Sequence, residues 1–359
     1  MVSYSDAGVD VEAGERAVAL MRGAIARATR PEVVGGFGGF AGLFDASALK
    51  VYTRPLLATS TDGIGTKVAV AQAMDIHDTI GQDLVAMVID DIVVCGAEPL
   101  FMTDYIATGK VVPERIAAIV AGIARGCEIA GCALVGGETA EHPGLLEPDE
   151  YDVAGAGTGV VEADRLLGAD RVRSGDVAIA MAASGLHSNG YSLARRVLLG
   201  DGGPGLTAYI DDLGCTVGEE LLEPTRIYAQ DCLDLVDNVD VHAFSHITGG
   251  GIAANLARVL PTHLSIDIDR STWTPPAIFS VIAGLGVDRA EMERTFNMGM
   301  GMVAIVDATA AGDAMARLRD RGVPSWPCGV VRDRRDGETG DAEAKGGGGG
   351  AALVLGEHP

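Results

Sequence analysis

Basic side chains are scarce: 27 lysines and arginines stand against 50 aspartates and glutamates, which gives a formal net charge of -23. Such a surface repels the phosphates of nucleic acids and of anionic membranes, so we expect neither as a partner. A phosphorylated small molecule would have to be held by metal cations, backbone amides or helix N-termini instead of a basic patch.

Long apolar segments, paired cysteines and aromatic side chains are also scarce. No apolar run reaches the about 18 residues of a membrane span, and the first residues lack the basic region of a signal peptide, so we expect a cytoplasmic protein. The six cysteines occur singly, which excludes ordinary zinc-ligand spacing and indicates buried thiols. Aromatic residues make up 4% of the chain and hydrophobic residues 48%, which is typical of an aliphatic core between helices and sheets.

The 359 residues predict two domains, and the periodicity of apolar residues predicts a mixed α/β (α+β) chain. A helix is expected after Pro113 and before Gly131, and another over Tyr191–Leu198. The expected strands are Leu56–Ser60, Ala133–Val135, Val153–Val161, Val177–Ala182, His263–Asp269, Met302–Val306 and Ala351–Leu355. A charged, turn-rich stretch places the domain boundary near residue 170, giving domains 1–170 and 171–359. A polar, glycine-rich stretch at about 333–350 is expected to be a disordered loop.

Glycine is abundant, with 50 residues, and most of it lies in short loops between the apolar segments. The loop at 35–42 matches a dinucleotide-binding fingerprint, but the strand and helix that this fingerprint needs are missing around it. We therefore interpret Gly36, Gly38 and Gly39 as part of a flap that closes over phosphates, with an ordinary surface loop as the alternative.

Carboxylates in apolar or loop settings point to a divalent cation. Asp62 follows a strand and precedes Lys67, so the pair predicts a Mg²⁺ ligand and a point charge for a phosphate, or else a simple turn. Asp90 and Asp91 interrupt an apolar helical segment at 81–95, where unpaired carboxylates would be costly unless a metal neutralises them or the helix has an exposed corner there. Glu138 is a further acidic candidate, with helix or loop capping as its alternative.

Two glycine-bounded turns are expected to bind anions. The turn with His187, Ser188, Asn189 and Gly190 precedes a helix, so it predicts a phosphate cradle, in which His187 donates either a proton or a hydrogen bond. The turn at 246–251 repeats the arrangement with Thr248, Gly249 and Gly250, whose backbone amides suit an anion. An N-cap or an ordinary turn is the alternative at each place.

Taken in order, eleven segments resemble the phosphoribosylformylglycinamidine cyclo-ligase family of purine biosynthesis over residues 3 to 331. The segments are GVDVEAGERAV at 8–18, RPEVVGGFGGFAGLF at 30–44, STDGIGTK at 60–67, DTIGQDLVAM at 78–87, GAEPLFMTDYIATGK at 96–110, LVGGETAEHPG at 134–144, YDVAGAGTGVVE at 151–162, SGLHSNGYSLAR at 184–195, LLEPTRIY at 221–228, HITGGGIAANLARVLP at 246–261 and TFNMGMGMV at 295–303.

This resemblance implies an N-terminal α/β domain whose sheet pairs across a homodimer and binds ATP and Mg²⁺, followed by a C-terminal α/β domain that binds the substrate. It implies ATP-dependent cyclisation of formylglycinamidine ribonucleotide to aminoimidazole ribonucleotide, with His187 and Asp91 as catalytic residues. Arg22 stands where many members carry a lysine, which changes the geometry of that cation. A related kinase of thiamine monophosphate is the alternative, and the absence of an early cysteine argues against selenophosphate synthesis.

Overall fold

The computed structural model of the chain describes residues 11–35, 39 and 41–359. Its contacts divide the chain into two compact units. The first unit holds the described residues up to Val93 together with Ala97–Asp164, and the second holds Val94–Gly96 with Arg165–Pro359. In the described part of the chain, every helix is too short or too polar to cross a membrane.

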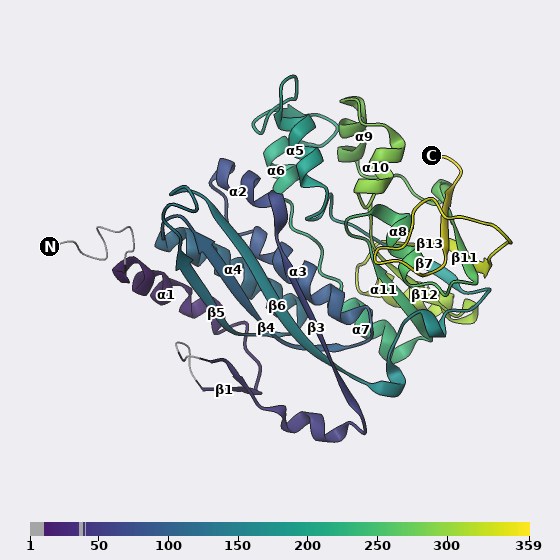
Figure 1. Ribbon diagram of the computed structural model, residues 1–359, viewed down its shortest axis with the longest axis horizontal. Coiled ribbons are helices and arrows are strands. Elements are labelled where there is room, and N and C mark those ends of the chain that lie inside the picture. Colours follow the sequence, from purple (N-terminus) through teal and green to yellow (C-terminus); the bar gives the residue numbers. More distant parts are fainter. Residues whose placement is uncertain (1–10, 36–38, 40) are drawn as a thin grey trace. The chain divides into compact units, whose positions relative to one another are not determined.

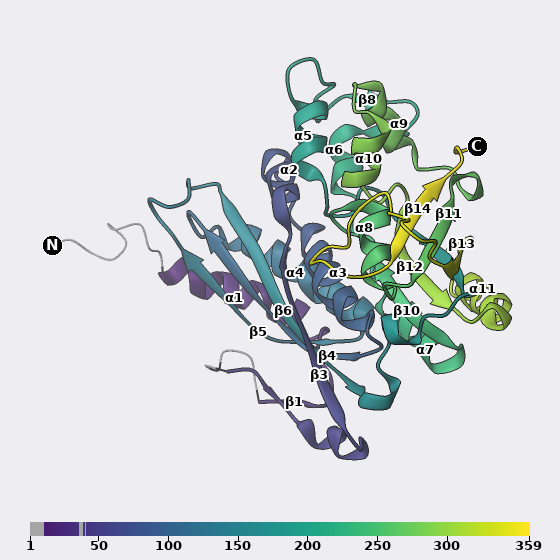
Figure 2. The same ribbon diagram turned by 45° about the vertical axis from the view of Figure 1, so that its right-hand side comes forward.

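The first unit contains a four-stranded sheet in the order β3-β6-β4-β5, with helices on one face (Figures 1 and 2). Its elements are α1 (Val11–Ile25), β1 (Val33–Val34), β2 (Leu43–Phe44), β3 (Pro55–Gly63), α2 (Val68–Met74), α3 (Ile80–Val93), β4 (Glu98–Thr108), α4 (Pro113–Ala130), β5 (Ala133–Glu141) and β6 (Tyr151–Glu162). Strands β4 and β5 are parallel, and β6 is antiparallel to both β3 and β4.

Helix α3 packs closely on β6 because glycine leaves room for it. A Cβ atom at Gly157 would lie 2.9 Å from side-chain carbons of Val88, Ile89 and Ile92. These aliphatic side chains are nearly or fully buried against the strand, so the small residues of β6 and the apolar side of α3 together form the core of this unit.

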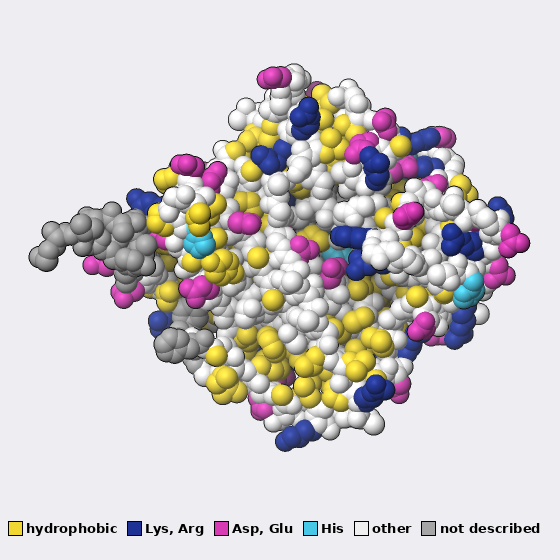
Figure 3. Space-filling view, viewed as in Figure 1, with side chains coloured by type: hydrophobic (Ala, Val, Ile, Leu, Met, Phe, Trp, Pro, Cys, Tyr) yellow, Lys and Arg dark blue, Asp and Glu magenta, His cyan; other side chains and the backbone are white. Residues whose placement is uncertain are grey.

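The opposite face of the sheet is not covered by any helix among the described residues of this unit. Burial alternates along β3 and along the first part of β6, with exposed residues on this face. Leu57 on β3 is 64% exposed and Tyr105 on β4 is 42% exposed. Figure 3 shows hydrophobic side chains gathered over the lower part of this sheet.

The second unit is built on a six-stranded sheet in the order β10-β12-β7-β13-β11-β14. Its elements are β7 (Val177–Ala182), α5 (Tyr191–Leu199), β8 (Tyr209–Ile210), β9 (Cys215–Thr216), α6 (Val217–Leu222), α7 (Ala229–Asn238), β10 (Val241–His246), α8 (Gly251–Arg258), β11 (Leu264–Asp269), α9 (Ala277–Gly284), α10 (Arg289–Thr295), β12 (Met300–Val306), α11 (Ala311–Asp320), β13 (Ser325–Asp333) and β14 (Ala351–Leu355). Strand β12 is fully buried along its length, so it lies at the centre of the core.

The expected α/β class is confirmed, as are the seven expected strands and the two expected helices. The ends of most elements change little, but the strand expected over Ala133–Val135 continues to Glu141. The last strand coincides with β14, and the helix that precedes Gly131 ends there because Gly131 adopts a left-handed conformation. Strand β4 is absent from the sequence-based prediction and lies at the centre of the first sheet.

The stretch expected to be disordered at about 333–350 differs from that expectation, because it makes specific contacts. The Glu338 carboxylate accepts hydrogen bonds from the Ser265 hydroxyl at 2.7 Å and from the Arg332 guanidinium at 2.9 and 3.0 Å. Arg332 also forms a bidentate pair with Asp267 on β11. These charge-assisted bonds, with the Arg332 pair holding the pKa of Glu338 down at about 2, attach the segment to the sheet.

Candidate active site

In the second unit, the two glycine-bounded turns lie at the same edge of the sheet. Strands β7 and β10 are both antiparallel to β12, which lies between them, so β7 and β10 run in the same direction and their carboxyl ends meet at one edge. Helix α5 follows the turn after β7, and α8 follows the turn after β10. An open α/β sheet commonly binds its ligands at this kind of edge.

A hydrogen bond joins the two turns directly. The backbone N–H of Gly249 donates to the side-chain oxygen of Asn189 at 3.0 Å. The N-cap residues of the two helices are Gly190 and Gly250, which have no side chain with which to cap the helix. Ser188 and Asn189 are therefore not the N-cap residues of α5, and each helix leaves the backbone amides of its first turn without a side-chain cap.

Buried His187 is held in one tautomer. Its φ of 63° lies in the left-handed region, which is uncommon for residues other than glycine, and the residue is only 2% exposed. The backbone N–H of Ser184 donates to His187 Nε2 at 3.2 Å, so Nε2 must carry a lone pair and the proton of the neutral imidazole lies on Nδ1. Any donation by neutral His187 therefore comes from Nδ1.

Three residues that the sequence analysis did not single out support this turn. Tyr228 packs its ring 6.1 Å from that of His187 and donates its hydroxyl proton to the Ala182 carbonyl at 2.8 Å. Asn297, nearly fully buried, donates to the Gly185 carbonyl at 3.0 Å, while its oxygen accepts from Gly299. Ser184 donates to the Pro224 carbonyl at 2.6 Å. The motifs EPTRIY and TFNMGMG indicated these segments, but not what they touch.

In the first unit, Asp62 is exposed near the carboxyl end of β3, and its Oδ1 accepts a hydrogen bond from the Gly63 N–H at 2.7 Å. It pairs across the sheet with Gly155, which in turn pairs with Asp104 on β4. Residues opposite one another across strands share a face, so Asp62 and Asp104 lie on the face that carries α3.

The structure corrects the role expected for Lys67. Lys67 and Asp83 are both 0% exposed, and the ammonium donates to the Asp83 carboxylate at 2.9 Å. An ammonium buried in this way and neutralised by a carboxylate does not provide a surface charge for a phosphate. Lys67 therefore stabilises the fold of this unit by compensating a buried charge on α3.

The other acidic candidates differ in burial and in the face of the sheet on which they lie. On α3, Asp90 is fully buried and Asp91 is exposed. Exposed Glu138 pairs across the sheet with Tyr105, and so lies on the uncovered face, opposite Asp62. Among the described residues, no group of three or more histidine, cysteine or acidic side chains is arranged to hold a metal ion. The three carboxylates Asp62, Asp90 and Asp91 do not form a complete protein-only site.

The remaining candidates are the glycines of the loop at 35–42 and Arg22. Gly36 and Gly38 lie outside the described residues, while Gly39 lies between β1 and β2 in the connection of an antiparallel hairpin. Among the described elements, this loop is flanked by the short strands β1 and β2, whereas a dinucleotide-binding fingerprint lies between a strand and a helix. Arg22 is exposed in the last turn of α1.

Asp104 is a buried carboxyl group that the sequence analysis missed. The residue is 8% exposed, and a Cβ atom at Gly137 would lie 2.4 Å from its Oδ1, so the glycine of β5 provides the space that the carboxyl occupies. Loss of hydration raises the pKa of Asp104 to about 7, and a backbone hydrogen bond opposes the shift only in part. A period-two pattern along β4 would have shown that this aspartate points inward.

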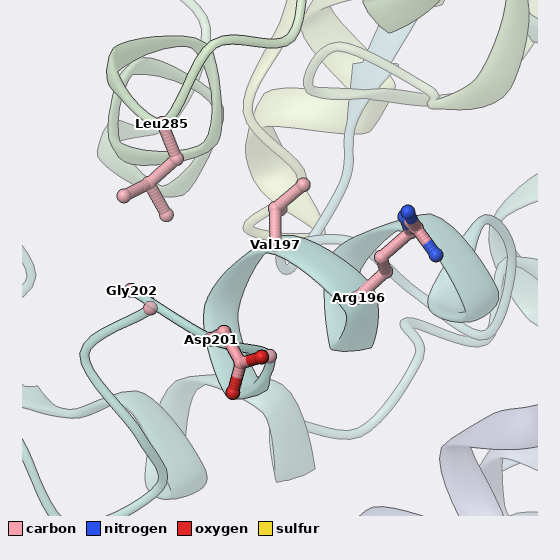
Figure 4. Close-up of a pocket in the computed structure, with 7 residues that line it drawn as sticks. Arg196, Val197, Asp201, Gly202 and Leu285 are labelled. Carbon is pink, nitrogen blue, oxygen red and sulfur yellow. The ribbon is translucent and has the colours of Figure 1, made fainter.

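A pocket of about 400 Å³ in the second unit lies away from these residues. It is lined by the end of α5, by the loop that follows and by Leu285 after α9, and Figure 4 shows Arg196, Asp201 and Leu285 around it. Ser188 and Gly190 precede the other end of α5. The pocket is therefore separate from the glycine turns.

Comparisons with known proteins identify the family. A family model described as AIR synthase related protein, N-terminal domain, matches residues 44–161, and its C-terminal counterpart matches residues 173–341. The chain is 50% identical to a phosphoribosylformylglycinamidine cyclo-ligase of Desulfitobacterium hafniense, over 93% of this chain and 98% of the relative. It is 52% identical to one of an Anaeromyxobacter species, over 92% of this chain and 96% of the relative.

Solved structures share the fold at lower identity. A thiamine-monophosphate kinase from Stenotrophomonas maltophilia superposes with a TM-score of 0.67 at 19% identity, covering 95% of this chain and 97% of the kinase. The hydrogenase maturation protein HypE, solved in complex with ATP, superposes with a TM-score of 0.63 at 19% identity, covering 90% of this chain and 87% of HypE. Since half of all aligned residues are shared with the cyclo-ligases over nearly their whole length, the chain belongs to the phosphoribosylformylglycinamidine cyclo-ligase family.

Proposed function

We propose that this chain is an ATP-dependent cyclo-ligase that converts formylglycinamidine ribonucleotide to aminoimidazole ribonucleotide in purine biosynthesis. ATP transfers its terminal phosphoryl group to the formyl amide oxygen and leaves as ADP. An amidine nitrogen then attacks the activated carbon, loses a proton, and displaces that oxygen as phosphate. Identity of 50% to relatives of this name, over almost the whole chain, supports the activity most strongly.

The contact between Asn189 and Gly249 is the structural observation that carries the substrate assignment. It brings together the two helix-opening turns of the second unit, SGLHSNG and HITGGG, which contain no lysine or arginine of their own. Backbone amides at helix N-termini hold phosphates in this manner. We therefore assign the ribose phosphate to Ser188, Asn189 and Gly190 on one turn, and to Thr248, Gly249 and Gly250 on the other.

His187 acts on the oxygen that leaves as phosphate. Its Nε2 is occupied by the Ser184 N–H, so Nδ1 is the atom that donates, either as a hydrogen bond or by proton transfer. Tyr228 and the backbone around it fix the ring, which lowers the cost of orienting the donor during the reaction.

The nucleotide belongs to the first unit, together with Mg²⁺. Asp62 and Asp91 present exposed carboxylate oxygens, the ligand type that Mg²⁺ prefers, and one or two carboxylates with phosphate oxygens commonly complete its coordination. When bound, Mg²⁺ neutralises charge on the triphosphate. Asp90 on α3, Glu138 on β5 and the glycines Gly36, Gly38 and Gly39 are further nucleotide-binding residues in this proposal, and Arg22 is a catalytic cation.

The uncovered face of the first sheet is where a second copy of the chain binds. Exposed Leu57 and Tyr105 give it an apolar surface, and a closed dimer would remove that surface from water. Glu138 lies on the same face, so dimerisation would place this carboxylate beside the partner.

Measurement of ADP release tests the function directly. Formylglycinamidine ribonucleotide with MgATP should yield ADP and aminoimidazole ribonucleotide, whereas thiamine monophosphate should yield no ADP. ADP release with thiamine monophosphate, and none with formylglycinamidine ribonucleotide, would establish the kinase instead. That alternative has less support, because its structural likeness stands at 19% identity and shows the fold alone.

A further inference from the structure

One short segment, residues 293–296, packs against both glycine turns. A Cβ atom at Gly251 would lie 1.7 Å from the backbone oxygen of Glu293, at the end of α10. A Cβ atom at Gly190 would lie 2.5 Å from the ring of Phe296. Both glycines have positive φ, so each turn depends on glycine for its conformation and for its contact with residues 293–296.

Arg270 anchors the segment 293–296 through Glu293. Its guanidinium forms two parallel hydrogen bonds with the Glu293 carboxylate, from Nε to Oε1 at 2.7 Å and from Nη2 to Oε2 at 2.6 Å. Arg270 is 8% exposed, and its remaining nitrogen donates to the backbone oxygens of Val354 and Gly356. The guanidinium therefore joins α10 to the chain that leaves β14, and its planar fork fixes the direction of the Glu293 side chain.

We propose that Arg270 is a positioning residue for the substrate turns, acting through Glu293. The Glu293 backbone presses on Gly251 at the first residue of α8, and Gly249 is bonded in turn to Asn189. A shift of the α10 end would move the amides of both turns together, and small displacements of such donors are costly for anion binding. The inference depends on the proposed role of these turns in holding the ribose phosphate.

Arg332 provides a matched control within the same unit. It also forms a bidentate pair, with Asp267, and a second pair with Glu338, and it also anchors a segment near the C-terminus. Its hydrogen bonds within the described part of the chain reach neither glycine turn. Loss of either arginine should lower stability, but only loss of Arg270 should disturb the turns.

The test compares Arg270→Ala and Arg332→Ala in the full-length protein. We expect Arg270→Ala to raise KM for formylglycinamidine ribonucleotide at least about fivefold, with KM for ATP unchanged and kcat affected less. Amide hydrogen exchange over 248–256 and 188–194 should become faster in this variant only. Arg270→Lys should recover part of the affinity, because it keeps the charge without the fork.

An unchanged substrate KM in Arg270→Ala, or an equal rise in Arg332→Ala, would overturn the inference. If Arg270→Ala does not fold, Glu293→Gln gives the same test, because it keeps the backbone that contacts Gly251 and weakens the pair. Ser188→Ala separates this inference from the proposed function. An unchanged substrate KM in Ser188→Ala would refute the phosphate assignment, while hydrogen exchange in Arg270→Ala would still test whether Arg270 positions the turns.

Discussion

Replacement of Asp104 by asparagine tests whether the first unit buries a carboxyl group that is protonated near neutral pH. Burial raises the pKa of Asp104 from an ordinary 3.8 to about 7. Between these values the folded protein keeps a proton that the unfolded chain releases, so stability must fall as the pH rises through this window. A shift of about three units corresponds to about 4 kcal/mol in full, and to about 2.5 kcal/mol between about pH 5 and about pH 8.

Asp104→Asn should remove this contribution, because an amide has nearly the shape of the protonated carboxyl and does not titrate. Urea unfolding at about pH 5 and about pH 8 gives the stability that each protein loses between these values, and the variant should lose about 2.5 kcal/mol less than the wild type. Asp152→Asn is the control, since Asp152 is an exposed carboxylate on β6 of the same sheet. If Asp104→Asn loses as much stability as the wild type between the two pH values, the carboxyl is not protonated there and the reasoning from burial is wrong.

Lys67→Met should destabilise the first unit by about 3–5 kcal/mol, because it leaves the Asp83 charge buried, and Lys67→Met with Asp83→Leu should recover much of that loss in urea unfolding. Asp62→Asn keeps the oxygen that accepts from Gly63 but loses the charge, so thermal unfolding should stay near wild type while calorimetry shows weaker binding of MgATP; normal MgATP binding would remove Asp62 from the metal site. Ser188→Ala should raise KM for the ribonucleotide by a factor equivalent to about 1–2 kcal/mol of binding free energy without affecting KM for ATP, and His187→Ala should lower kcat. If Ser188→Ala raises only the KM for ATP, the turn binds the nucleotide. Light scattering at micromolar concentration should show a dimer, and Leu57→Lys should weaken it; a wild-type monomer would contradict the role assigned to the uncovered sheet face.

Local patterns in the sequence are sufficient for elements whose burial repeats with a regular period. The helix from Pro113 to Ala130 has a proline at its start, an apolar stripe and a glycine at its end, and all three signals act within one element. The apolar runs at Val177–Ala182 and Ala351–Leu355 are bounded by turn residues, and both strands occur as expected. Strand β4 was missed, although its inward and outward residues largely alternate as they do in other strands.

Residue types in the glycine turns point to anion binding from the sequence alone. Helices that begin from glycine expose backbone amides whichever way the rest of the chain folds, so SGLHSNG and HITGGG carry that property locally. The order of the motifs identifies the family resemblance, which the comparisons confirm.

Only the tertiary structure decided which groups meet. Asn189 and Gly249 are 60 positions apart. Lys67, in η3 (Gly65–Lys67), pairs with Asp83 on α3, 16 positions away, although the sequence suggests a phosphate for that lysine. Asp62 and Glu138 look equivalent in sequence, yet strand register places them on opposite faces of one sheet. The period of a strand or helix is set by neighbouring residues, whereas the pairing and desolvation of a charge depend on distant segments, and that is why Lys67 was misassigned and Asp104 was overlooked.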